Sequence, residues 1–441
     1  MVVREAWRPE VGRYLEVSRA VRAGELLFQE EPLFLSSRVE SVALVEELFD
    51  DLQEEAWSLP LATQVFLCVL KELLDSGGQG SEAGSVAAGC ACEASACEAC
   101  PKLEKLAYLK GHVGKWHSSA MMLYQGLKAQ VAERVSSERF EELYATCATN
   151  AHEADGGDGA ALFLKGSMAE HSCRPTAFKQ IRAGSGSVPQ GETRLVVHAL
   201  RDLDVGEAIS ISYIPEYYPT WLRQSMLQHG FNFQCGCERC LSGGAELCCC
   251  FVCPECEGPC CPPGAVYEEG AYELLRCEDC GLELHDTELL GALKRAERCE
   301  EFATTMSGKL HPYHFKIFHM YLKHLDQVPA GTALQILPQL QEAFHRLRPV
   351  EKGHPLHAQL AQCAAECWEK VEDEEQEAGP AWLRAAELYD LCAGPASADA
   401  AQCRRAAQRA TASGQNDATW RGHTGSGMDE VGRRDAESAR R

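Results

Sequence analysis

Three cysteines near the middle of the chain have the spacing of metal ligands. Cys235, Cys237 and Cys240 form a Cys-x-Cys-x-x-Cys run. Structural zinc sites take four ligands, with thiolate sulfur prominent among them, so this run is one ligand short. The nearest single cysteine upstream is Cys173, in a Glu-His-Ser-Cys-Arg-Pro stretch. If Cys173 supplies the fourth sulfur, a zinc ion ties this stretch to a much later part of the chain.

A second group of cysteines follows. Cys253 and Cys256 form one Cys-x-x-Cys pair, and Cys277 and Cys280 form another. Two such pairs at this separation are typical of a zinc ribbon, and four cysteines leave no open position for catalysis. We therefore predict a second, structural zinc site. Five further cysteines in this part of the chain are either alternative ligands or merely tolerated: Cys248, Cys249, Cys250, Cys260 and Cys261.

A third group of cysteines lies earlier, after a loop over residues 77–89 that is rich in glycine, serine and alanine. Its spacing could bind zinc, with histidines downstream, but few apolar residues are nearby to build around a metal. The sequence leaves this possibility open for Cys90, Cys92, Cys97 and Cys100.

Tyr213 ends an alternating, β-branched run that begins after a turn at residues 204–206. An earlier stretch, residues 12–28, has the same pattern of strand, Gly-Glu turn and strand. We predict a β-hairpin at each place, and hence a small-stranded β domain that is split across the sequence.

Four motifs in a fixed order resemble the SET-domain protein-lysine methyltransferases. They are a glycine turn near the N-terminus, His-Ser-Cys-x-Pro, Gly-Glu-x-Ile-x-Ile-Ser-Tyr, and Phe-x-Cys-x-Cys-x-x-Cys. The helical insertion after the first turn resembles the SET and MYND branch of that family. The resemblance covers roughly residues 8–290 and, more loosely, the helical remainder.

The resemblance implies a fold of small β-sheets with a knot-like crossing, and S-adenosylmethionine as cofactor. It places Tyr213 at the reacting centre, as the catalytic residue, and Phe233 against the adenine. It assigns the first zinc ion to Cys173, Cys235, Cys237 and Cys240. From the residues alone, His171 is either a hydrogen-bonded support for the metal or a ligand-facing group. The residues that would line the cofactor pocket are Arg13, Tyr14, Asn150, Glu170, His171, Tyr213 and Phe233.

The sequence departs from the family pattern in four places. Glu170 and Thr176 stand where the family usually has asparagine, and Tyr14 stands where a second glycine is expected. No MYND zinc module is recognisable. Glu170 matters most, because a carboxylate can accept from the cofactor's ammonium group but repels its carboxylate, and burying it without a partner is costly. We expect Glu170 to weaken cofactor binding without abolishing it.

Apolar residues at helical spacing predict helices over much of the remaining chain. Two His-Pro pairs, at residues 311–312 and 354–355, are each expected to open a helix. The C-terminal helices resemble stacked tetratricopeptide-like pairs that could bind protein partners. The predicted α+β organisation is an N-terminal SET part over 1–40, a helical insertion over 41–148, the rest of the SET domain over 149–230, a post-SET and zinc-ribbon region over 231–290, helical repeats over 291–411 and a disordered tail over 412–441.

Charge and composition narrow the function. The net charge is −23, which argues against binding duplex nucleic acid through a basic face and suits a basic peptide substrate. No apolar run is long enough to span a membrane, and no secretory signal is visible. Twelve of the 24 cysteines lie between residues 235 and 280, which favours metal binding in a reducing compartment, the cytoplasm or the nucleus.

Three functions fit these features. The first is a protein-lysine methyltransferase that uses S-adenosylmethionine and about two zinc ions on a protein or peptide with an accessible lysine. The second is a weakly active or inactive SET-like scaffold whose helical C-terminal domain binds partner proteins. The third, a cysteine-rich metal-handling protein, leaves the motif around Tyr213 unexplained.

Overall fold

The chain forms two compact units in the computed structural model. The first comprises residues 1–244 and 264–271, and the second comprises 245–263 and 272–441. No helix among the described residues is both long enough and apolar enough to cross a membrane. The structure describes residues 2–9, 12–50, 59–76, 102–109, 111–154, 159–182, 193–242, 244–266, 268, 273–285, 310–323, 328–347, 353–371, 375–394 and 397–424.

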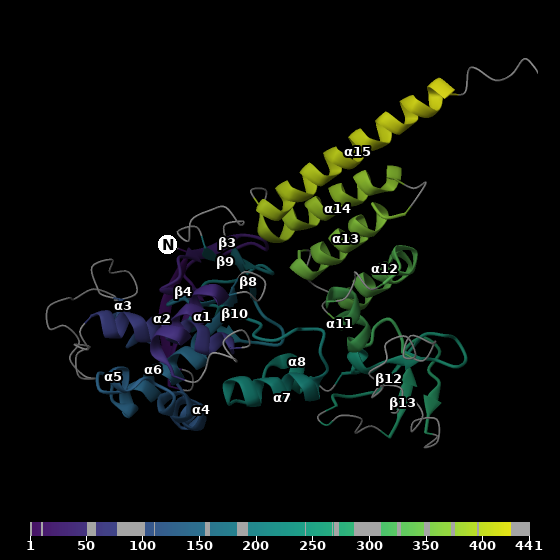
Figure 1. Cartoon of the computed structure of the whole chain (residues 1–441). Helices are drawn as coiled ribbons and strands as arrows, with labels where there is room; N and C mark the ends of the chain where they lie inside the picture. The colour runs from purple at the N-terminus through teal and green to yellow at the C-terminus, as the bar shows by residue number, and fades with distance from the viewer. Residues whose placement is uncertain are drawn as a thin grey trace, which may run out of the picture. The chain divides into compact units, whose positions relative to one another are not determined.

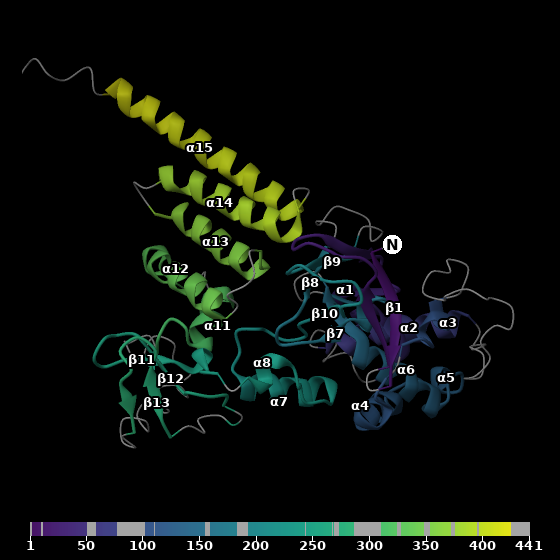
Figure 2. The same cartoon turned by 180° about the vertical axis from the view of Figure 1, so that it is seen from behind.

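The first unit is built on small sheets of short strands (Figures 1 and 2). One sheet has the order β3-β9-β8, a second has the order β4-β6-β5, and two further sheets each join two strands, β1 with β2 and β7 with β10. The strands are β1 (Val3–Arg8), β2 (Gly12–Val17), β3 (Leu26–Glu30), β4 (Phe34–Ser37), β5 (Ala151–Ala154), β6 (Gly159–Leu162), β7 (Glu170–His171), β8 (Ala177–Arg182), β9 (Arg194–Ala199) and β10 (Ser210–Ile211).

The two predicted hairpins were wrong, although most of their strands exist. β2 pairs with β1 and β3 pairs with β9, so the strands of the first stretch do not pair with each other. β10 pairs with β7 in parallel, not with β9. Instead, the two similar Gly-Glu corners bind one another: Val21 and Leu203 exchange backbone hydrogen bonds of 3.0 and 2.9 Å. The local pattern identified two equivalent corners, but a local pattern cannot show that each is the other's partner.

Helices between the two halves of the β domain cover the β4-β6-β5 sheet. The central helix, α2, is largely buried and carries Phe66, whose ring packs edge-on against Phe140 and Tyr144 at 4.8 and 5.2 Å. Burying a phenylalanine side chain of this kind contributes about 1.5–3 kcal/mol. The helices are α1 (Arg38–Leu48), α2 (Leu61–Asp75), α3 (Lys102–Leu106), α4 (Val113–Gln125), α5 (Ala129–Ala132) and α6 (Ser137–Asn150).

The parallel pairing of β7 with β10 brings together the two motifs that carry the chemistry. Glu170 lies opposite Ser210, and His171 lies opposite Ile211. The backbone N–H of Ser172 continues the ladder by donating to the carbonyl of Ile211 at 3.1 Å. Because Tyr213 follows β10 by two residues, this register sets it beside the end of β7. Beyond it, the helices α7 (Thr220–Phe231) and α8 (Glu238–Leu241) complete the unit.

The second unit begins with a four-stranded antiparallel ribbon. Its strands are β11 (Phe251–Val252), β12 (Pro259–Cys261), β13 (Leu275–Cys277) and β14 (Glu283–Leu284), hydrogen-bonded in that order. The five cysteines that the sequence left unassigned are all buried, from 0 to 1% exposed: Cys248, Cys249, Cys250, Cys260 and Cys261.

Helices follow the ribbon. Figures 1 and 2 both show α13, α14 and α15 side by side, as expected of stacked helix pairs. The second His-Pro pair opens a helix as predicted: His354 caps α13 by accepting from the N–H of Leu356, and Pro355 occupies the first turn. The first pair does not open α11 directly, because that helix begins three residues after Pro312. The last helix continues past the predicted boundary at residue 411. The helices are α11 (Phe315–Lys323), α12 (Ala330–Leu347), α13 (Pro355–Trp368), α14 (Glu375–Ala393) and α15 (Ala398–Thr424).

Candidate functional site: a cysteine cluster beside Tyr213

Four cysteines meet between β7 and α8, and they are those that the sequence grouped together. The sulfur atoms of Cys173, Cys235, Cys237 and Cys240 all lie within 4.8 Å of one another. The sulfurs of Cys173 and Cys240 are 3.6 Å apart. A tetrahedral zinc ion with Zn–S bonds of about 2.3 Å requires sulfurs about 3.8 Å apart. The donor set and its spacing therefore fit a structural zinc ion.

Two arginines support this cluster. Arg223, on α7, is only 1% exposed, and its Nη2 lies 3.8 Å from the sulfur of Cys240. Arg239 donates to the carbonyl oxygens of Cys173 (3.3 Å) and Glu216 (2.5 Å). Four thiolates around a divalent ion carry a formal charge of −2, which is costly to bury alone. The guanidinium of Arg223 offsets part of that charge, and Arg239 fixes the backbone that carries one ligand.

His171 connects the cluster with Tyr213. Its Nδ1 accepts a hydrogen bond of 3.1 Å from the backbone N–H of Tyr213, so the neutral ring carries its proton on Nε2. That Nε2 lies 3.4 Å from the sulfur of Cys173. Burial lowers the pKa of His171 to about 4, which keeps the ring neutral. The geometry agrees with a supporting role, in which His171 orients a metal ligand and the tyrosine backbone together.

Tyr213 lies in an aromatic setting. Its hydroxyl donates to the carbonyl of Ala169 at 2.6 Å, and its ring centre is 4.8 Å from that of Phe231 and 5.2 Å from that of His171. The ring of Phe233 also lies near His171, with ring centres 5.8 Å apart. Burial, and secondarily the charge of Glu170, raises the pKa of Tyr213. The hydroxyl therefore stays protonated and polar at neutral pH.

Glu170 has a partner, contrary to the concern that it would be buried alone. Arg8, from β1, donates to its carboxylate at 2.5 Å. The guanidinium carbon of Arg8 also lies 3.9 Å from the centre of the Tyr14 ring. Tyr14 in turn donates to the carboxylate of Glu16 at 2.8 Å. Two of the departures from the family pattern, Tyr14 and Glu170, are thus joined through one arginine.

Arg13 and Asn150 are engaged elsewhere in the first unit. Arg13 donates to the carbonyl of Tyr108, and its guanidinium lies 5.1 Å from the centre of that ring. Asn150, the last residue of α6, donates through its side chain to the carbonyl of Thr146 at 2.8 Å. Their cofactor-binding roles stay predictions from the resemblance.

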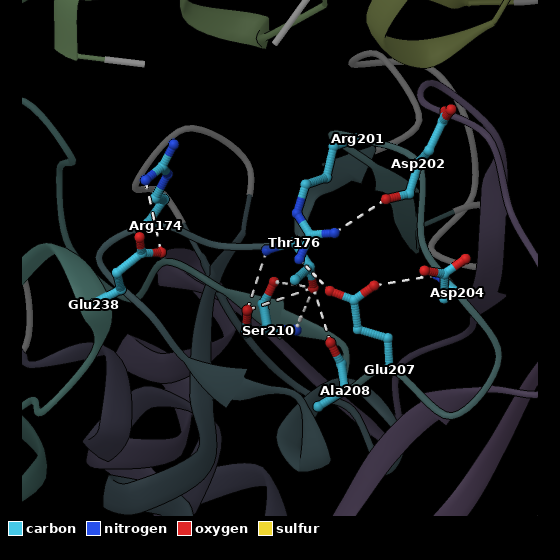
Figure 3. A network of polar contacts seen from close by, with 9 residues as sticks. All are labelled: Arg174, Thr176, Arg201, Asp202, Asp204, Glu207, Ala208, Ser210 and Glu238. Atoms are coloured by element: carbon cyan, nitrogen blue, oxygen red, sulfur yellow. Dashed lines mark hydrogen bonds and ion pairs between the residues drawn. The ribbon is translucent and has the colours of Figure 1, made fainter. Parts of the chain in front are cut away.

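Thr176, the third departure, anchors β8 to the strand that leads to Tyr213 (Figure 3). Its hydroxyl accepts from the N–H of Ser210 at 2.8 Å and donates to the carbonyl of Ala208 at 3.1 Å. Its own N–H donates to the hydroxyl of Ser210 at 3.0 Å. Threonine here satisfies backbone groups on both sides of the crossing, as an asparagine side chain could.

The second predicted cluster also assembles. The sulfurs of Cys253, Cys256, Cys277 and Cys280 lie within 4.8 Å of one another. Two sulfur–sulfur distances, 3.7 Å for Cys253 and Cys280 and 3.4 Å for Cys256 and Cys277, again suit tetrahedral zinc. The third group of cysteines, at residues 90–100, lies outside the described residues.

Sequence reasoning missed three residues that position this region. Arg8 and Arg223 are single arginines without a motif, and each meets its partner only in the folded chain. Glu30 accepts backbone hydrogen bonds from Leu164, Lys165 and Gly166 at 2.8–3.0 Å, and so holds the turn before β7. The only sequence signal for Glu30 was a carboxylate at the end of a strand that begins with three apolar residues.

Comparisons with known proteins agree with this geometry. Residues 12–214 match the model of the SET domain. The human protein-lysine N-trimethyltransferase SMYD5 is 30% identical over 123 residues, which are 27% of this chain and 28% of that protein. The histone-lysine N-methyltransferase ATXR4 of Arabidopsis thaliana is 33% identical over 90 residues, 20% of this chain and 25% of that protein. The matched segments therefore span about a quarter of these relatives.

Among solved structures, one of Rubisco LSMT bound to AdoMet aligns with 98% of this chain and 93% of its own, at 11% identity and a TM-score of 0.31. That likeness is too low to add to the assignment, which depends on the domain match and the assembled motifs. The SMYD5 relatives are in line with the SET and MYND branch that the sequence resembles. The chain therefore carries a SET domain over residues 12–214.

Proposed function

We propose that the chain is a protein-lysine N-methyltransferase that uses S-adenosylmethionine. The observation that carries the proposal is the junction itself, where one cysteine cluster joins the β7 segment to the chain beyond Tyr213. This junction sets Tyr213, His171 and Phe233 side by side. The domain match and the methyltransferase names of the relatives point to the same chemistry.

The cofactor would supply an activated methyl group on a sulfonium, so the protein's task is to hold a neutral lysine amine in line with it. Tyr213 is suited to that task because burial keeps its hydroxyl protonated, and because Ala169 fixes the direction of that hydroxyl. Because the hydroxyl dipole is already oriented, it can position the lysine amine and stabilise the charge that develops during methyl transfer without first having to turn. The buried Nε of Arg8, which has no hydrogen-bond partner among the described residues, is a donor that the cofactor's carboxylate would satisfy.

The substrate would be a protein or peptide with an accessible lysine, and the net charge of −23 favours basic sequences around it. The two sulfur clusters would each hold one zinc ion, and free thiolates of this kind persist in the reducing cytoplasm or nucleus. The first zinc ion would stabilise the segment carrying Phe233, which couples metal content to cofactor affinity.

The proposal is tested with labelled S-adenosylmethionine, a panel of basic peptides and whole cell extract. Tyr213→Phe removes one hydroxyl, and we expect transfer to fall at least about 100-fold while cofactor binding is retained. Tyr124→Phe is the matched control, because the Tyr124 hydroxyl likewise donates to a backbone carbonyl, that of Val135 at 3.1 Å, but within the helical insertion. Equal transfer by the wild type and Tyr213→Phe would contradict the proposed role of Tyr213.

A second function has its own structural support. The successive packed helices from α12 to α15 form an array of the kind that binds protein partners. A wild-type protein that binds S-adenosylmethionine weakly or not at all, and transfers no label to any protein, would favour such a scaffold over the enzyme.

A further inference from the structure

The pairing of Arg8 with Glu170 joins residues 162 positions apart in sequence. Arg8 is the last residue of β1, and Glu170 is the first residue of β7. Their side chains are 43% and 25% exposed, so solvent reaches the pair and it is not sealed in the core. Glu170 is also close enough to Tyr213 and Tyr14 to act on both electrostatically.

Arg8 has hydrogen-bonding capacity that the described residues do not use. A guanidinium carries five N–H donors in a planar fork, and here the Nη2 of Arg8 donates to Glu170. The face of the guanidinium packs on the Tyr14 ring, 3.9 Å from its centre, which fixes the plane of the fork. Its Nε is buried and has no partner among the described residues. Buried donors are normally satisfied, and a fork held in this way is suited to receive a carboxylate.

The two charges together match one chemical group. An α-amino acid at neutral pH carries an ammonium and a carboxylate on the same carbon. Glu170 can accept from the ammonium, and Arg8 can donate two parallel hydrogen bonds to the carboxylate. S-adenosylmethionine ends in such a group, so the pair turns the charge at position 170 from a source of repulsion into half of a complementary site.

We propose that Arg8 and Glu170 form a clamp for the amino-acid end of the cofactor, with Arg8 binding its carboxylate and Glu170 its ammonium. This inference rests on the proposed function, since it assumes that the cofactor binds beside Tyr213. The competing explanation is a salt bridge that only ties β1 to β7. The two explanations differ in how binding responds to changes in the ligand.

The clamp reverses an expectation drawn from the sequence. A lone carboxylate at position 170 would repel the cofactor, so Glu170→Asn should then tighten binding. With Arg8 in place, Glu170→Asn replaces the charged acceptor for the ammonium with a neutral amide oxygen, so binding should weaken. Whether Glu170→Asn tightens or weakens cofactor binding therefore separates a repelling carboxylate from the clamp.

The deciding experiment compares two ligands by calorimetric titration into the zinc-loaded full-length protein. One is S-adenosylmethionine, and the other is its decarboxylated form, which keeps the ammonium but lacks the carboxylate. We expect the wild type to prefer the intact cofactor at least about tenfold, because charge-assisted bidentate bonds are strong. Arg8→Met should lose that preference by weakening only the intact cofactor, whereas Glu170→Gln should weaken both ligands.

Arg4→Met is the matched control. Arg4 lies on the same strand and pairs with Glu16 at 2.6 Å, and it is expected to leave the ligand preference unchanged. Equal wild-type affinity for the two ligands, or Arg8→Met weakening both equally, would overturn the clamp and leave the proposed function intact. A wild type that binds neither ligand would overturn the proposed function, and the clamp with it. If Arg8→Met does not fold, the wild-type preference and Glu170→Gln still decide the question.

Discussion

The two cysteine clusters have the same ligand set, but the first links segments that are far apart in the sequence and the second links segments that are close together. The first joins Cys173 to a run that begins at Cys235, so it closes a long loop that contains three strands of the β domain, β8, β9 and β10, the last of which pairs with β7. The second joins two Cys-x-x-Cys pairs within one ribbon, from Cys253 to Cys280. The first cluster therefore links motifs that are distant in the sequence, and the second stabilises a single local ribbon.

Burial differs in the same way. In the first cluster only Cys237 is partly exposed, and the buried Arg223 lies against Cys240. In the second, Cys256 and Cys280 are exposed to water, which can itself screen the charge of the metal site. A cluster inside the fold needs a cation from the protein, whereas a cluster at the surface can rely on solvent. This difference leads to four predictions.

The largest effect is expected from Cys173→Ser. Serine removes one ligand of the first site, so the β7 segment and the chain after Tyr213 lose their common anchor. We expect the free energy of unfolding of the first unit to fall by more than ~4 kcal/mol, and cofactor binding to be lost with it. Zinc analysis should show about one ion fewer per chain. Cys68→Ser, at a partly buried thiol outside both clusters, is the control. Unchanged zinc content would show that Cys173 is not a ligand.

Cys277→Ser should have a smaller and more local effect. The ribbon loses its zinc ion and its order, but the junction at Tyr213 belongs to the other unit. We expect one zinc ion fewer and a lower unfolding temperature, or a lost unfolding transition, for the second unit. Cofactor affinity should stay within about twofold of the wild type, since the two clusters belong to separate compact units and share no ligand. Differential scanning calorimetry with cofactor titration measures both. A loss of cofactor binding equal to that of Cys173→Ser would remove the distinction between a tertiary and a local cluster.

Arg223→Met tests the charge argument. Methionine keeps much of the buried volume of arginine but not its positive charge. We expect the zinc affinity of the first site to fall about 10–100-fold, the range typical of lost outer partners of metal ligands, with the second site unaffected. Competition with a chelator, which removes the two ions in sequence, measures this. Arg276→Met is the counterpart at the second cluster. Arg276 is exposed and adjacent to Cys277, so its loss should change neither site.

The same contrast explains what the sequence could show. The sequence identified the ligands that lie close together in the chain, because short cysteine spacings are characteristic of zinc sites. These are Cys235, Cys237 and Cys240, and the two Cys-x-x-Cys pairs of the ribbon. Cys173 was reached only as the nearest single cysteine upstream and through the motif order. The helices followed from apolar periodicity, and on α2 the apolar residue Phe66 is indeed buried.

Pairings across the chain were beyond sequence reasoning. Arg8 acquires its role because it lies opposite Gly12 in the β1-β2 register, which makes Tyr14 its diagonal neighbour on the adjacent strand. Neither that register nor the approach of β7 is encoded near Arg8. The hairpin prediction failed for a related reason: turn residues show where a strand ends but not which strand it pairs with.

The smallest predicted effect concerns one glycine beside each cluster. Gly281 follows the second cluster with φ at +77°, a conformation that costs a residue with a side chain about 1–2 kcal/mol. Gly236, between two ligands of the first cluster, has no such backbone angle, and a Cβ there would meet nothing within 4 Å. Gly281→Ala should therefore destabilise the ribbon by about 1 kcal/mol and speed release of its zinc ion. Gly236→Ala should leave the first site unchanged, or stabilise it slightly by restricting the unfolded chain. Zinc release to a colorimetric chelator, followed for each variant, measures both. Equal effects at the two positions would show that backbone strain does not distinguish the local cluster from the tertiary one.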